Sequence, residues 1–140
     1  MSTERPATDG PVLHVGCPMW AHRAWVGLHL PDDTLSGAEL VPYSRLLNAV
    51  EGNTTFYALP SPATVAKWAE QAHPDFRFVC KAPRTITHDR RLRGTTDELR
   101  AFLALLAPLG DRLGGVMLQL PGSFGPDDLP VLSGALCDLP

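Results

Sequence analysis

The sequence predicts an α/β fold with a parallel sheet, of the TIM (β/α)8-barrel type, with only about the first four βα units present. Three observations carry this prediction. Four short β-rich runs alternate with four helical patterns. One face of each run becomes polar toward its carboxyl end, where barrel active sites lie. The 140 residues end where a fifth strand would follow, at about half a barrel's usual length. An open doubly wound sheet, complete at this length, is the alternative.

The expected strands are short runs of apolar and β-branched residues bounded by turn residues. They are residues 12–17 (VLHVGC), 48–53 (NAVEGN), 76–81 (FRFVCK) and 114–121 (GGVMLQLP).

The expected helices follow these runs, at 37–49, 61–72, 95–110 and 126–139. Pro42 confines the regular part of the first helix to its carboxyl side. Ser61 is the expected N-cap of the second helix, with Pro62 at the first helical position. A capping box from Thr95 to Glu98 is expected to begin the third helix, which ends at Gly110.

Composition describes one ordinary globular domain: 44% hydrophobic and 19% charged residues, with a net charge of −3. We expect a flexible tail at 1–11 and a domain at 12–140. A polar start, an odd number of cysteines without CxxC spacing and short apolar runs favour a cytoplasmic protein with no membrane segment.

Strand alternation gathers five polar residues on one face of the sheet, near its carboxyl edge. They are His14, Glu51, Asn53, Lys81 and Gln119. A sheet that simply ends there would also place single polar residues at strand ends, but four strands doing so predict a pocket.

Two of these residues are predicted to be catalytic. Glu51 suits a general base, and Lys81 suits an anion holder or Schiff-base amine. That the two merely neutralise each other is an equal alternative. Asn53, Thr55 and Gln119 are expected to bind substrate through neutral hydrogen bonds. Aromatic side chains, including Trp20 and Tyr57, are expected to line the mouth, although aromatics after a strand often pack a loop down.

Residues 81–93 (KAPRTITHDRRLR) carry a net charge of +4 in a chain whose remainder carries −7. This predicts an anion site, with Arg84 and His88 nearest the strand end. A solvated loop whose arginines pair with nearby acids is the alternative, favoured for Arg91 and Arg93. His14, Glu51 and His88 have no metal-site spacing, so no metal or other cofactor is expected.

Four stretches occur in order that together resemble the YecE-like family, domain of unknown function 72. They are VGCPMW, VEGNTTFYALPSP, FRFVCKAPRTITHDRRL and LGGVMLQLPGSF. The resemblance covers residues 12–140 and implies a TIM barrel without its second half. The chain departs from the family's commoner Gly-Thr-Ser-Gly-Trp form but keeps Gly16 and Trp20. The family has no settled activity.

The leading hypothesis is therefore an enzyme acting on a small anionic or polar substrate at the carboxyl mouth of the barrel. One alternative is a nucleic-acid-binding barrel resembling DNA-repair barrels, which follows phosphates with Arg84, Arg90, Arg91 and Arg93. Another is a truncated chain without activity of its own, which self-associates through open sheet edges.

Overall fold

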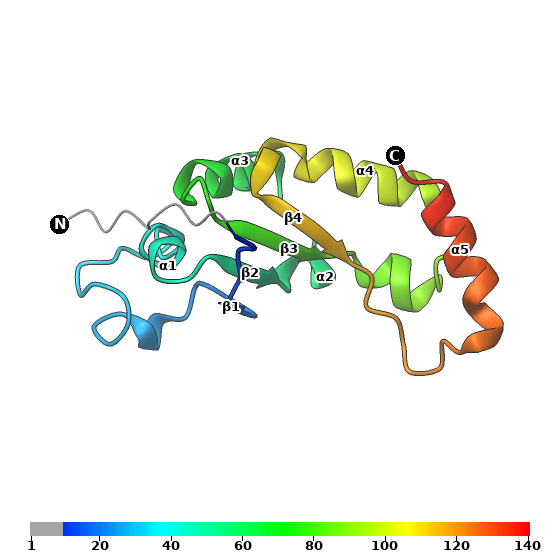
Figure 1. The fold of residues 1–140 in the computed structure, drawn as a ribbon, viewed down its shortest axis with the longest axis horizontal. Coiled ribbons are helices and arrows are strands. Elements are labelled where there is room, and N and C mark those ends of the chain that lie inside the picture. The colour runs from blue at the N-terminus through cyan, green and yellow to red at the C-terminus, as the bar shows by residue number, and fades with distance from the viewer. Residues whose placement is uncertain (1–9) are drawn as a thin grey trace.

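The computed structural model describes residues 10–140, so most of the expected tail lies outside the described residues. Four parallel strands form one sheet in the order β1-β2-β3-β4 (Figure 1). They are β1 (Gly16–Cys17), β2 (Ala49–Gly52), β3 (Arg77–Lys81) and β4 (Leu113–Met117). The predicted parallel α/β sheet is confirmed. It is an open sheet in which β1 and β4 form the edges.

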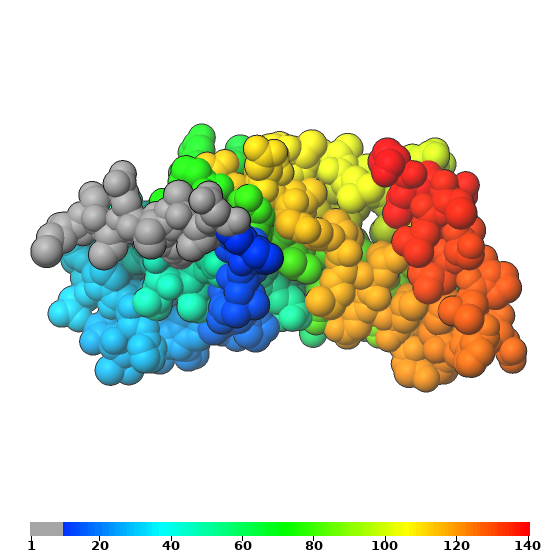
Figure 2. All heavy atoms as spheres, in the orientation of Figure 1, coloured from blue at the N-terminus to red at the C-terminus, as the bar shows by residue number. Residues whose placement is uncertain are grey.

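The α-helices are α1 (Leu40–Leu46), α2 (Thr54–Tyr57), α3 (Pro62–Gln71), α4 (Thr96–Leu106) and α5 (Leu129–Cys137). Shorter 3-10 turns are η1 (Arg23–Trp25), η3 (Ala107–Arg112) and η4 (Pro126–Asp128), and η2 (Thr85–Asp89) is a π-helix. The segment between β1 and α1 lies at one end of the molecule and α5 at the other (Figure 2). No helix of residues 10–140 has the length and apolar character to cross a bilayer.

The core lies on the helix-covered face of the sheet. Val50, Phe78 and Cys80 point into it and are at most 1% exposed. From the helices, Val65, Leu99 and Phe102 are among the residues that meet them. Val79 and Lys81, which alternate with Phe78 and Cys80, are half-buried on the opposite face. The period of two in β3 thus separates a packed face from an open one.

Gly16 brings the first strand close to the second. A Cβ atom at this position would lie 2.0 Å from the carbonyl oxygen of Ala49. Ala49 is the partner of Gly16 in the β1–β2 pairing. Only glycine therefore allows this approach.

Several boundaries differ from those expected. The first strand covers only 16–17 of the expected 12–17, and the fourth ends at Met117 rather than 121. Pro42 lies within the first turn of α1, where a missing N–H costs no hydrogen bond, so the helix begins before it. Ser61 caps α3 as predicted, and its Oγ accepts from the Thr64 N–H at 3.1 Å.

The expected capping box of the third helix is wrong. Thr95 precedes α4 but makes no side-chain cap, and its buried Oγ1 has no partner within residues 10–140. The Glu98 carboxylate pairs with Arg90 instead. The helix also ends earlier, at Leu106, where a 3-10 turn containing Gly110 at φ 54° continues toward β4.

Candidate functional site

An ion pair joins the carboxyl ends of the two central strands. β2 and β3 are parallel neighbours, and Glu51 lies opposite Val79. Lys81 follows Val79 by two residues, so its side chain lies on the same face of the sheet. The Nζ atom of Lys81 lies 2.8 Å from Oε1 of Glu51. The two predicted catalytic residues therefore share one face and touch. We call this pair the ion-pair site.

The ion-pair site is sheltered but reachable. The side chain of Lys81 is 13% exposed and that of Glu51 is 36% exposed. A carboxylate in this position can accept a proton, and an ammonium group can hold an anion. The same contact is also what the alternative predicts, in which the two charges only neutralise each other.

Thr55 and Asn53 fix the backbone around the ion-pair site. Thr55 is 1% exposed. Its Oγ1 lies 2.6 Å from the Lys81 carbonyl oxygen and 2.9 Å from that of Gly52, so its one hydrogen can bond to either. The Asn53 amide donates from Nδ2 to the Pro18 carbonyl oxygen at 3.0 Å. These two side chains tie the ends of β1, β2 and β3 together.

Trp20 lies away from the ion pair, and Gln119 lies beyond the end of β4. The Trp20 ring packs edge-on against Trp68 at 5.2 Å and Phe78 at 6.1 Å between centroids. Phe78 belongs to the helix-covered face, so Trp20 lies on the other side of the sheet from Lys81. Gln119 follows the end of β4 by two residues and is exposed. We leave both out of the proposed site, and their substrate-binding role stays a prediction.

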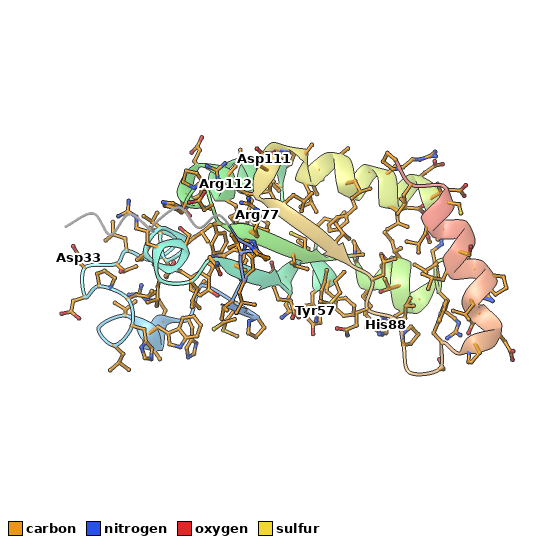
Figure 3. All side chains as sticks on the ribbon, viewed as in Figure 1. Asp33, Tyr57, Arg77, His88, Asp111 and Arg112 are labelled. Carbon is orange, nitrogen blue, oxygen red and sulfur yellow. The ribbon has the colours of Figure 1, made fainter. Side chains whose placement is uncertain are left out.

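A second group of predicted site residues gathers around the π-helix. Phe56 packs edge-on against both Tyr57 at 5.1 Å and His88 at 5.2 Å. Nδ1 of His88 lies 3.1 Å from Oγ1 of Thr87. Tyr57 and His88 lie toward the carboxyl ends of the strands, whereas Arg77 and Arg112 lie at their amino ends (Figure 3). Arg84 pairs with Asp89, with 3.7 Å between Nε and Oδ1.

The arginines of the basic segment are paired with acids. Arg90 contacts Glu98, Arg91 lies 2.7 Å from Asp128, and Arg93 lies 3.3 Å from the other oxygen of Asp128. A hydrogen bond from the Gly125 amide, aided by Arg91 and Arg93, holds the pKa of Asp128 below its usual value. The positive charge predicted for this segment is thus largely matched inside the protein.

Metal binding and thiol chemistry receive no support from the residues that the structure describes. Within residues 10–140, His14, Glu51 and His88 form no cluster of three metal-ligating side chains, nor does any other set. The cysteines at 17, 80 and 137 are free. Burial raises the pKa of the Cys80 thiol to about 12, so this thiol stays protonated at neutral pH.

A pocket of about 600 Å3 beside the π-helix was not predicted from the sequence. Its wall includes Glu98, Ala101, Phe102 and Leu105, which follow helical spacing along one stripe of α4. That stripe was visible in the sequence. The facing wall was not, because neither α2 nor the π-helix was predicted.

Comparison with known proteins shows the family. The family model described as "Protein of unknown function DUF72" matches residues 14–140. The chain belongs to the DUF72 family. The resemblance drawn from the four sequence stretches is therefore confirmed.

Relatives and solved structures of DUF72 proteins agree with this assignment. The chain is 44% identical over 129 residues to UPF0759 protein YecE of Escherichia coli strain K12, a match covering 92% of this chain and 45% of that protein. A DUF72 crystal structure from Thermotoga maritima MSB8 is 25% identical, with a TM-score of 0.73 over 91% of this chain and 52% of that one. One from Enterococcus faecalis V583 is 25% identical, with a TM-score of 0.70 over 91% and 48%. The chain spans about half the length of these relatives.

Proposed function

We propose that this DUF72 chain carries part of the active site of an enzyme acting on a small anionic or polar substrate. The observation that supports the proposal is the 2.8 Å contact between Lys81 and Glu51 at the carboxyl edge of the sheet. In parallel α/β folds this edge is where ligands bind. The two side chains supply opposite charges at the place where such a substrate would enter.

The proposed chemistry divides the two roles between the two residues. An anionic or strongly polar substrate group binds the Lys81 ammonium and replaces Glu51 as its partner. The freed Glu51 carboxylate then accepts a proton from a neighbouring C–H or O–H of the same substrate. Thr55 and Asn53 act as positioning residues, because they bond to backbone carbonyl groups at the strand ends.

We propose further that the four βα units belong to a (β/α)8 barrel whose interior is the face that carries the ion-pair site. The sequential parallel order of the strands supports this. So does the likeness to DUF72 structures about half of whose length the chain covers.

The free cysteines support a reducing, cytoplasmic setting.

Nucleic-acid binding receives less support. It would need Arg84, Arg90, Arg91 and Arg93 to meet phosphates, and each of the four pairs with an acidic side chain. A steep fall of nucleic-acid affinity with salt would favour it over the enzyme.

Phosphate binding tests the anion site, and the two lysines of the chain allow a matched pair of variants. We expect inorganic phosphate, titrated by calorimetry, to bind the wild-type chain, and Lys81→Met to weaken it by about tenfold or more. Lys67→Met, at an exposed position of α3, is the matched control and should leave affinity unchanged. Equal affinities of the two variants, or no binding to the wild type, would reject the site.

Glu51→Gln separates binding from proton transfer. Removing the carboxylate that competes for Lys81 should keep or strengthen phosphate binding. The same change should abolish any turnover found among phosphate and carboxylate esters and sugar phosphates. A Glu51→Gln chain as active as the wild type would argue against the enzyme.

A further inference from the structure

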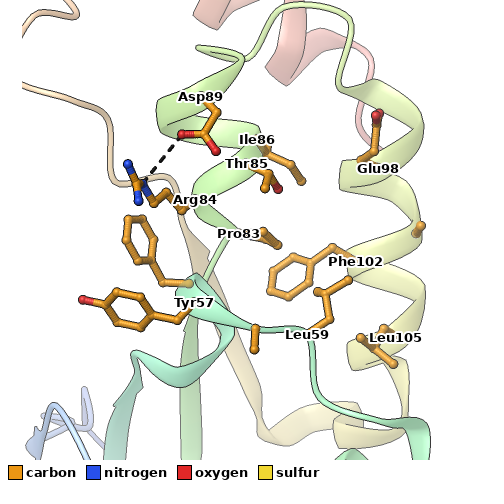
Figure 4. A pocket seen from close by; sticks show the side chains of 13 residues that line it. Tyr57, Leu59, Pro83, Arg84, Thr85, Ile86, Asp89, Glu98, Phe102 and Leu105 are labelled. Atoms are coloured by element: carbon orange, nitrogen blue, oxygen red, sulfur yellow. Dashed lines mark ion pairs between the residues drawn. The ribbon is translucent and has the colours of Figure 1, made fainter.

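The pocket beside the π-helix is separate from the ion-pair site. Its walls come from three segments: residues 56–59 after β2, residues 83–89 after β3, and one stripe of α4 (Figure 4). Neither Glu51 nor Lys81 lines it. At about 600 Å3 it falls within the size range of small-molecule sites. We call it the π-helix pocket.

The floor of the π-helix pocket is apolar. Phe102 and Ile86 are 2% and 3% exposed and form its deep part, with Pro83 and Leu105 beside them. Leu59 lines the pocket and is 60% exposed. Covering such a large exposed apolar side chain with a ligand buries apolar surface, which contributes favourable binding free energy. The floor therefore suits the apolar body of a small molecule.

The rim of the pocket carries both signs of charge. Arg84 and Asp89 face each other with 3.7 Å between Nε and Oδ1, and their side chains are 62% and 52% exposed (Figure 4). At that distance and exposure the pair is weakly coupled. Glu98, also on the rim, is engaged by Arg90. The rim thus offers one loosely held cation and one loosely held anion.

A ligand with a single charge would meet a like charge on this rim. A carboxylate near Arg84 is repelled by Asp89, and an ammonium near Asp89 is repelled by Arg84. A ligand with both groups satisfies both side chains by charge-assisted hydrogen bonds. We propose that the π-helix pocket binds a small zwitterion with an apolar body, such as an apolar α-amino acid. Its carboxylate lies on Arg84, its ammonium on Asp89, and its side chain on Phe102 and Leu59.

The local backbone explains how these groups come together. Thr85, Ile86 and Asp89 lie in the π-helix and all line the pocket, with Thr85 and Ile86 directed toward Phe102 and Asp89 directed toward Arg84 (Figure 4). Single π-turns within helical segments are rare and often mark functional sites. Here the turn presents an apolar floor residue and a charged rim residue from five consecutive positions.

Titration calorimetry with three probes of one shape tests the proposal. L-phenylalanine carries both charges, 3-phenylpropionate only the negative one and 2-phenylethylamine only the positive one. We expect L-phenylalanine to bind at least about tenfold more tightly than either of the others. Equal binding of 3-phenylpropionate would reduce the site to an anion site and overturn the proposal. No saturable binding of L-phenylalanine at millimolar concentration would overturn it as well.

Variants at exposed positions locate the binding. Arg84→Gln and Asp89→Asn should each weaken L-phenylalanine binding by about tenfold. Leu59→Ser should weaken it without altering the charges. The controls Lys67→Gln and Glu70→Gln change exposed charges on α3, outside the pocket, and should have no effect. Lys81→Met should also leave this binding unchanged, which separates it from the proposed enzyme site. If the controls weaken binding as much as Arg84→Gln, the ligand does not occupy this pocket.

Discussion

At the scale of single residues, Thr95 carries a hydroxyl group that the fold does not use. The side chain is 1% exposed, and its Oγ1 has no hydrogen-bond partner within residues 10–140. A buried, unpaired hydroxyl costs free energy relative to an apolar group of the same shape. We therefore expect Thr95→Val to leave the free energy of unfolding unchanged or raise it by up to about 1 kcal/mol, measured by urea denaturation.

Ser61 provides the matched control, because it is a cap that does form. Its Oγ accepts from the Thr64 N–H at 3.1 Å, and Ser61→Ala should lower the free energy of unfolding by about 1 kcal/mol. If Thr95→Val costs as much as Ser61→Ala, the Thr95 hydroxyl has a partner and the capping box exists after all.

Gly16 offers a second test at a single position. Gly16→Ala would place a methyl group 2.0 Å from the Ala49 carbonyl oxygen, so β1 must move away from β2. We expect faster hydrogen exchange at the Ala49 N–H, which donates to the Val15 carbonyl oxygen at 3.2 Å. Gly122→Ala is the control, since a Cβ there meets no atom within 4 Å. Unchanged protection in Gly16→Ala would show that β1 pairs with β2 in another register.

At the scale of secondary structure, the sequence predicted those elements whose signals are local. β3 was predicted because Phe78 and Cys80 alternate with Val79 and Lys81, and its one buried face imposes that period. α3 was predicted from the Ser61 cap and Pro62. The π-helix and α2 were missed because each is shorter than two helical turns and is held by contacts from elsewhere in the chain. Thr55, for example, is fixed by the Lys81 carbonyl oxygen, 26 residues away.

The same distinction applies to the candidate site. Alternation alone placed Glu51 and Lys81 on one face, and their contact agrees with it. Alternation could not show that Trp20 would pack against Trp68, because that contact depends on where α3 crosses the sheet. Nor could it show that Arg91 and Arg93 would meet Asp128, which follows β4.

Ion pairs of Asp128 with Arg91 and Arg93 connect the segment before α5 to the segment after the π-helix. The stability that they contribute should depend on pH. The Gly125 amide, followed by Arg91 and Arg93, lowers the pKa of Asp128 below its usual value of 3.8. A lowered pKa in the folded state stabilises the protein above pH 3.8, and this stabilisation is lost as the pH falls through the folded-state pKa. Asp128→Asn should therefore be less stable than the wild type at neutral pH, and the difference should shrink in acid.

Urea denaturation across a pH series measures this difference. The neighbouring Asp127→Asn is the control, because Asp127 is exposed and takes part in none of the ion pairs described here. A destabilisation by Asp128→Asn that stays constant down to strongly acidic pH would mean that charge does not contribute, and that only the shape of the side chain matters.

At the scale of the whole molecule, the described sheet has two edges and one face with little cover. β1 and β4 each pair on one side only within residues 10–140. Near the β1 edge, Leu13 is 80% exposed and Val15 is 51% exposed, and on α5 Leu136 is 51% exposed. Unpaired parallel edges next to exposed apolar side chains favour pairing with another chain. The fold positions the ion-pair site on this same open face.

We predict that the chain of residues 1–140, prepared alone, self-associates or is poorly folded, and has little activity by itself. Each Å2 of apolar face left uncovered forgoes about 25 cal/mol of burial free energy. A domain's net stability is only about 5–15 kcal/mol, so a few hundred Å2 around Val79 and Met117 would consume much of it.

Sedimentation velocity at several concentrations, combined with thermal melting, measures both outcomes. Association should raise the sedimentation coefficient and the melting temperature together as concentration increases, because the associated state is the folded one. A monomer at all concentrations with a sharp, concentration-independent melting transition would contradict the prediction. The four strands would then be stable as an open sheet, and the uncovered face would no longer argue for a barrel.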